Sequence, residues 1–193
     1  SLSTKVAGYT MDVRGAGVNT EILMSFNTSN VVSLLTTPDG VNFVPTEIFV
    51  AGAPDRFARL GICFGAGNTF WAKSWASDAG AGKLFLVQYD ANAGTGTILR
   101  TYDTDKVSST MTTVAYNDSL KLLAGIARDD QKNVQLYSVA DLDLGPVLRD
   151  QELFPTYNPS IEANGALDFG GNTYLFAMNE NNGVMAFLID SSY

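Results

Sequence analysis

The sequence predicts an all-β protein built from about four repeated units of four antiparallel strands. A Gly-Asn-Thr-aromatic string at residues 67–70 recurs at residues 171–174, 104 residues later. A weaker copy, Gly17-Val18-Asn19-Thr20, has its Asn 49 residues before Asn68, so the repeat period is about 50 residues. Between these turns the chain forms short apolar runs rich in β-branched and aromatic residues, bounded by Gly, Asn, Asp and Ser, which is typical of strands joined by hairpins.

Each predicted unit has an apolar run on either side of its turn, then a polar turn and a third run. A fourth run follows in the first three units. These runs place the units at residues 8–50, 58–103, 111–154 and 164–193 of one repeat domain, residues 1–193. The last unit has only three runs, and we expect residues 2–7 to supply its outer strand. A β-sandwich is the alternative fold, although the internal repeat counts against it.

Four-stranded units at this period resemble the blades of β-propeller repeat proteins, in which WD40 and kelch repeats run about 40–50 residues. The likeness covers the whole chain, but the Trp-Asp signature of WD40 and the Gly-Gly pattern of kelch blades are both absent. The nearest likeness is to an uncharacterised, often secreted family of bacterial propeller-like proteins. Two architectures stay open: a closed ring of four blades, or half of a larger propeller completed by a second copy or a missing part.

Composition excludes several classes of function. The chain of 193 residues has 20 acidic and 12 basic residues, a balance that argues against nucleic-acid binding. No apolar run reaches the roughly 18 residues of a membrane helix, so we expect no membrane insertion. The absence of histidine excludes His-based triads and His-ligated metals. One cysteine, Cys63, cannot form a disulfide within the chain. Because there is no initiator Met, we expect Ser1 to be the start of a processed, truncated or engineered fragment.

The propeller resemblance implies a ligand face near the central channel. Such a face is built by the loops that precede each inner strand and by those between the second and third strands. Six candidate binding residues lie in or near these loops: Lys73, Arg128, Asp129, Glu162, Asn179 and Glu180. They would recognise a small molecule, a glycan or a protein. The alternative is an internal salt-bridge network, such as Lys73 with Glu180, because buried charges are usually paired.

Carboxylates are the only acid/base groups that the sequence offers for hydrolysis. A glycosidase needs two of them about 5–10 Å apart, and several candidates exist: Asp129, Asp130, Glu162, Asp168 and Glu180. Asp-rich turns at residues 103–105, 129–130 and 141–143 offer oxygen ligands for Ca²⁺ but lack EF-hand spacing. We therefore assign no catalytic residue and no metal ligand, and we expect no cofactor, with Ca²⁺ as the alternative.

Three functions follow from these observations. The first is a non-catalytic propeller that acts as a binding or assembly scaffold, secreted or in the cell envelope. The second is a carboxylate-based sugar or lactone hydrolase or lyase, with Ca²⁺ as an optional cofactor. The third is a structural oligomer, such as a homodimer, in which partial propellers associate through open edges. The absence of histidine places the scaffold first.

Overall fold

The computed structural model describes residues 8–26, 29–127, 133–156, 165–179 and 182–190. These residues form fifteen β-strands and one 3₁₀ turn, Gly17–Asn19, which confirms the predicted all-β class. Within this described part, no helix is long and apolar enough to cross a membrane. The expectation that residues 2–7 complete the last unit falls outside the described residues.

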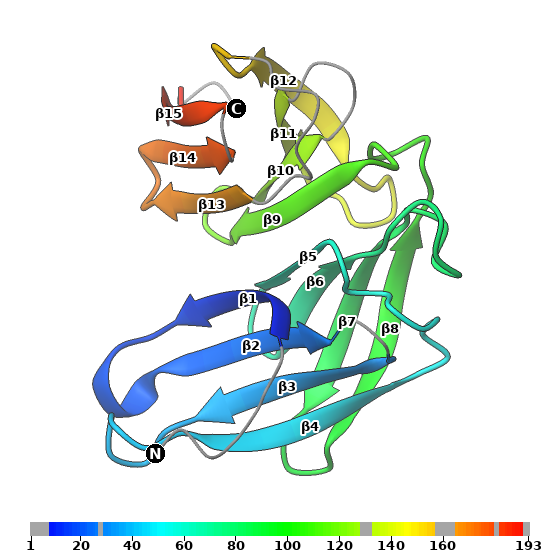
Figure 1. The fold of residues 1–193 in the computed structure, drawn as a ribbon, viewed down its shortest axis with the longest axis vertical. Helices are drawn as coiled ribbons and strands as arrows, with labels where there is room; N and C mark the ends of the chain where they lie inside the picture. The colour runs from blue at the N-terminus through cyan, green and yellow to red at the C-terminus, as the bar shows by residue number, and fades with distance from the viewer. Residues whose placement is uncertain (1–7, 27–28, 128–132, 157–164, 180–181, 191–193) are drawn as a thin grey trace.

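The strands follow one another as four antiparallel units, and consecutive strands pair within each unit (Figure 1). Unit one contains β1 (Gly8–Arg14), β2 (Glu21–Phe26), β3 (Val31–Thr36) and β4 (Val44–Ala51). Unit two contains β5 (Gly61–Phe64), β6 (Thr69–Lys73), β7 (Leu84–Asp90) and β8 (Thr95–Tyr102). Unit three contains β9 (Met111–Asn117), β10 (Leu122–Ala127), β11 (Asn133–Ser138) and β12 (Val147–Leu153). Unit four contains β13 (Gly165–Gly170), β14 (Tyr174–Asn179) and β15 (Gly183–Leu188).

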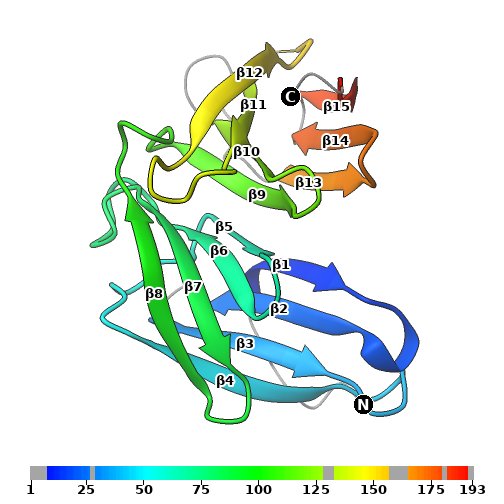
Figure 2. The same cartoon turned by 180° about the vertical axis from the view of Figure 1, so that it is seen from behind.

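The first strands of the units form an arc. β1 contacts β5, β5 contacts β9, and β9 contacts β13, whereas the later strands of each unit project outward (Figure 1). Units one and two are also joined at their outer edges, where residues 49–51 of β4 pair in parallel with residues 95–97 of β8 (Figure 2). This pairing satisfies two strand edges that would otherwise be open. A β-sandwich is not needed to describe this arrangement.

One apolar cluster fills the space between each pair of consecutive units. The first joins Leu34 and Ile48 of unit one to Phe70 and Phe85 of unit two. The second joins Trp71 and Leu86 to residues of unit three, including Met111, Leu123 and Tyr137. The third joins Leu122 and Ile126 to Leu175 and Ala177 of unit four. A strand that lies between two of these clusters, such as β10, is therefore apolar and buried along its whole length.

The recurring Gly-Asn-Thr turn is a docking point between units. Arg14, the last residue of β1, donates from Nη1 to the carbonyl oxygen of Gly67 at 2.8 Å. Asn117, the last residue of β9, donates from Nδ2 to the carbonyl oxygen of Gly171 at 2.8 Å. Each bond ties an inner strand to the turn of the next unit, which gives a physical reason for the repeated motif in units two and four.

Candidate functional site

The four inner strands converge on one cavity of about 430 Å³. A cavity of this size falls in the range of small-molecule sites, roughly 300–1,000 Å³. Every unit contributes to its wall through its innermost strand, and unit one adds a residue of β2. The lining residues are Thr10, Met11, Asp12, Met24, Gly61, Ile62, Thr113, Val114, Gly165, Ala166 and Leu167.

Two glycines allow close packing around this cavity. A Cβ on Gly61 would lie 3.0 Å from Val114 Cγ2 and 3.1 Å from the Val114 nitrogen. A Cβ on Gly165 would lie 2.8 Å from both Ile126 Cδ1 and the Met178 carbonyl oxygen. Contacts this short require a shift of the neighbouring atoms, so glycine at the start of β5 and of β13 keeps the wall closely packed.

Asp12 is the acidic group in the cavity wall. Its Oδ2 accepts a hydrogen bond of 2.8 Å from the Phe64 backbone nitrogen, and its Oδ1 accepts one of 2.8 Å from the Val13 nitrogen. The first bond links β1 to β5 and fixes the orientation of the carboxyl group. Burial raises the pKa of Asp12 above the ordinary 3.8, while these hydrogen bonds oppose the shift. A carboxyl group with a raised pKa in a cavity is suited to proton transfer.

A second carboxylate, Asp168, acts on Asp12 across the opening of the arc. Asp12 and Asp168 occupy the same position in their strands, each two residues before the last residue. The negative charge of Asp168 further raises the pKa of Asp12. Asp168 is exposed, on the face of β13 that is turned away from unit three. The two carboxylates thus form an unequal pair, one half-buried and one in solvent.

Two threonines add hydroxyl groups to the same wall. Thr10 Oγ1 lies 2.9 Å from Ser25 Oγ, and Thr113 Oγ1 donates to the Gly165 carbonyl oxygen at 3.4 Å. Thr113 has a φ of 50°, and its nitrogen donates to the Leu60 carbonyl oxygen at 2.7 Å. This left-handed conformation bridges β9 to the segment before β5. Hydroxyl and carboxylate groups together suit a ligand that carries several hydroxyls.

Among the described residues, no three His, Cys, Asp or Glu side chains are grouped so that they could hold a metal ion. The predicted Asp129 and Asp130 turn lies outside these residues, so a Ca²⁺ site there stays a prediction.

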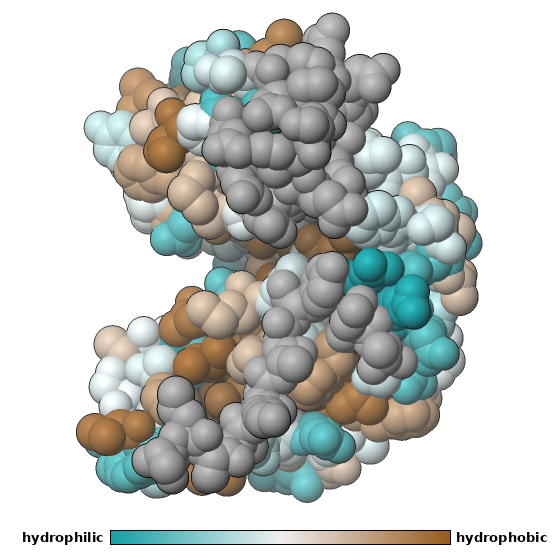
Figure 3. Space-filling model, viewed as in Figure 1, coloured by the Kyte–Doolittle hydropathy of each residue, from teal (hydrophilic) through white to brown (hydrophobic). Residues whose placement is uncertain are grey.

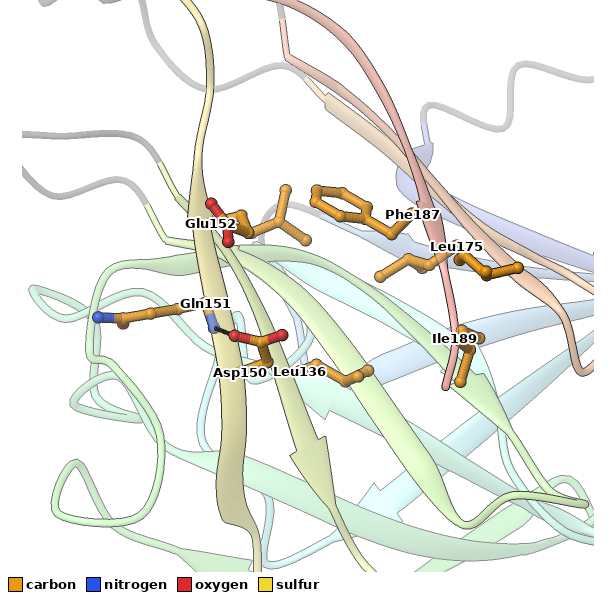
Figure 4. Close-up of a pocket in the computed structure, with 9 residues that line it drawn as sticks. Leu136, Asp150, Gln151, Glu152, Leu175, Phe187 and Ile189 are labelled. Carbon is orange, nitrogen blue, oxygen red and sulfur yellow. Dashed lines mark hydrogen bonds between the residues drawn. The ribbon is translucent and has the colours of Figure 1, made fainter. Parts of the chain in front are cut away.

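A second hollow lies between units three and four, where β12 faces β15 (Figure 4). Its volume is about 60 Å³, too small for a sugar ring. Leu136, Leu175, Phe187 and Ile189 form its apolar side, and Asp150 and Glu152 lie on the β12 side. We interpret it as a packing groove between units.

Only two of the six predicted site residues are described, and neither lines the cavity. Lys73 is buried at the end of β6, and Asn179 is buried at the end of β14, where its Oδ1 accepts a hydrogen bond from Asn182 Nδ2. Arg128, Asp129, Glu162 and Glu180 lie outside the described residues, as does the predicted Lys73–Glu180 pair. The residue that sequence reasoning missed is Asp12. Its signal was a carboxylate between Met11 and Val13 in the predicted first inner strand.

Lys73 is held by carbonyl oxygens. Its Nζ donates to the Ser74 carbonyl oxygen at 3.0 Å and to the Ser109 carbonyl oxygen at 3.1 Å. Burial lowers the pKa of Lys73 from the ordinary 10.5 to about 7. Between these two values the unfolded chain binds more protons than the folded chain. Lys73 therefore makes the free energy of unfolding rise with pH above 7, by at most about 1.4 kcal/mol per pH unit.

We expect Lys73→Met to remove this contribution and to stabilise the protein most at pH 7. Urea unfolding of both proteins at pH 7, 8 and 9 measures it. The stability advantage of Lys73→Met over the wild type should shrink as the pH rises. An advantage that stays constant with pH, or a variant less stable than the wild type at pH 7, would contradict this account of Lys73.

Comparison with known proteins identifies the fold class. No protein-family model matches the sequence, and no curated protein matches it. Among solved structures, a candidate 6-phosphogluconolactonase from Bacteroides uniformis matches with a TM-score of 0.55 and 13% identity, over 94% of this chain and 50% of that chain. Another from Bacteroides fragilis matches with a TM-score of 0.54 and 15% identity, over 98% of this chain and 51% of that chain. This chain therefore spans about half the length of the structures it matches.

These matches confirm the predicted propeller-like fold of about four antiparallel blades. They also correct the function expected from the sequence. A non-catalytic scaffold ranked first because the chain lacks histidine, but the neighbours are described as candidate 6-phosphogluconolactonases, which contradicts that ranking.

Proposed function

We propose that this chain forms the lactone-binding channel of a propeller-like hydrolase that opens lactones of sugar acids. The main observation behind this proposal is the position of Asp12. Its half-buried carboxyl group, with a raised pKa, lies in the cavity where all four inner strands meet. The description of the structural neighbours as candidate 6-phosphogluconolactonases supports this reaction class. The channel wall supports it independently, because it combines a carboxylate with hydroxyl groups.

Asp12 is the general base in this proposal. Each of its oxygens already accepts one backbone hydrogen bond, and each retains a lone pair that can accept a proton from water. The water attacks the lactone carbonyl carbon as Asp12 takes its proton. The ring C–O bond then breaks, and the leaving oxygen takes the proton from Asp12, which gives the open hydroxy acid and restores the carboxylate. General-base catalysis of this type contributes about 10²–10⁴-fold to the rate.

The pH dependence of the reaction tests the role of the carboxylate pair. The test substrates are δ-gluconolactone and its 6-phosphate, and ring opening is followed above the uncatalysed rate. We expect kcat/KM to fall below the pKa of Asp12, because the protonated carboxyl group cannot act as a base. Replacing Asp168 with Asn removes a charge that raises this pKa. The fall of kcat/KM on the acidic side of the pH profile, its acidic limb, should therefore move to lower pH.

The matched control is Asp105→Asn, which removes an exposed carboxylate in the loop between β8 and β9. This control should leave the acidic limb unchanged. Failure to accelerate the opening of either lactone would contradict the proposed function. A limb that moves equally in both variants would contradict the pairing of Asp168 with Asp12.

A further inference from the structure

Unit four has an apolar face that no described residue covers. Alternate residues of β14 and β15 point to this face, and each of the large ones is 44–70% exposed. The residues are Tyr174, Phe176, Met178, Val184 and Leu188. Tyr174 and Phe176 stack on each other with ring centroids 6.0 Å apart. Exposed apolar patches of this kind mark sites of protein association.

The opposite face of unit four is apolar too, and it is covered by a neighbouring unit. There Leu175 and Ala177 are buried against Leu122 and Ile126 of unit three. β14 is thus apolar on both faces, which is typical of a strand that lies between two packed layers. In units two and three, both faces of the sheet contact a neighbouring unit. Within the described part of the chain, unit four has a partner on one face only.

At the other end of the arc, the outward side of β1 in unit one is also exposed. Met11 is 64% exposed and Val13 is 50% exposed. Their neighbours in β1, Asp12 and Arg14, point to unit two, where they bond to Phe64 and Gly67. The outward residues of β1 therefore lie on the face opposite unit two, where a preceding unit would pack.

Both open faces border the same side of the molecule. Units one and four lie at the two ends of the arc, and the opening between β13 and β1 is seen as a hollow on the left of Figure 3. Brown apolar side chains of both halves border this hollow. A partner that fills the opening must meet unit four with one end and unit one with the other.

A second copy of this chain meets both requirements at once. Its unit one can pack on unit four of the first chain while its unit four packs on unit one, as two-fold symmetry requires. Two copies also supply about the chain length of the solved structures, of which one copy covers 50–51%. We propose that two chains associate in this way and close a ring around the central channel. The second copy then supplies the missing wall of the Asp12 cavity.

Mass measurement in solution tests this association without reference to catalysis. We expect a single species of twice 20.7 kDa by native mass spectrometry and light scattering. Phe176→Glu and Val184→Glu each place a charge on the open face of unit four and should raise the dissociation constant by about 100-fold. Leu144→Glu is the control, because Leu144 is 57% exposed on a loop outside both open faces. A wild-type monomer would overturn the proposal, as would a dimer that all three variants leave intact.

Cross-linking tests the orientation. Val13→Cys and Phe176→Cys are prepared separately, and the native Cys63 is buried and does not interfere. A short bis-maleimide should join the two variants only when they are mixed, and the product should have twice the chain mass. Cross-links within either unmixed pool, or products that grow into longer polymers, would show a different association and overturn the closed pair.

Discussion

Replacement of Asp12 with Asn is expected to lower kcat/KM for lactone opening by about 10²–10⁴-fold. The amide cannot take a proton from water at neutral pH, so the step assigned to Asp12 is lost. The measurement is initial-rate kinetics with the lactone that the wild type opens fastest. The loss should appear mainly in kcat, because Thr10 and Thr113 still line the cavity.

Two controls separate this effect from a loss of structure. The amide oxygen can still accept the hydrogen bond from the Phe64 nitrogen, and circular dichroism and a thermal melt establish that the variant is folded. Asp105→Asn removes one carboxylate elsewhere and should keep full activity. A folded Asp12→Asn variant with activity within a few-fold of the wild type would exclude Asp12 as the base.

Replacement of Trp71 with Ala should have the largest effect on stability, a loss of about 3–5 kcal/mol. Trp71 is 1% exposed, and its ring centroid lies 6.1 Å from that of Tyr102 and 5.9 Å from that of Tyr116. It belongs to the apolar cluster that joins units two and three. Its removal leaves a cavity at the middle interface of the arc, and urea unfolding measures the cost.

Trp75 provides a matched control four residues further along the chain. It is partly exposed, and the Arg59 guanidinium lies 4.9 Å from its ring centroid. Trp75→Ala should therefore cost much less, on the order of 1 kcal/mol. Equal losses for the two tryptophan variants would contradict the assignment of the main contribution to the interface between units two and three.

The fold was predictable because its signals are local. The Gly-Asn-Thr turns at residues 67–69 and 171–173 and the β-branched runs between them depend on neighbouring residues in sequence. The reason for the turn motif was not predictable. The bonds of Arg14 and Asn117 to the turn of the next unit connect residues more than 50 positions apart.

The site was harder to predict because it forms only where the units meet. In the sequence, Asp12 is one polar residue in a predicted strand. Its proposed role depends on the Phe64 nitrogen and on Asp168 at the far end of the arc, which only the folded chain brings to it. Lys73 was selected for its charge, yet packing places it against the Ser74 and Ser109 carbonyl oxygens, away from the channel. The secreted location and the Ca²⁺ site stay predictions.

The most direct test of the central claim is a ¹³C NMR titration of the aspartate carboxyl groups, with and without a sugar lactam that mimics the lactone but resists hydrolysis. If the channel is the lactone site, Asp12 should titrate above the ordinary value of 3.8, and its resonance and pKa should change when the lactam binds. Asp105, which lies in the loop between β8 and β9 and does not line the cavity, should not respond to the lactam. An Asp12 resonance that titrates at the ordinary value and ignores the lactam would contradict the claim.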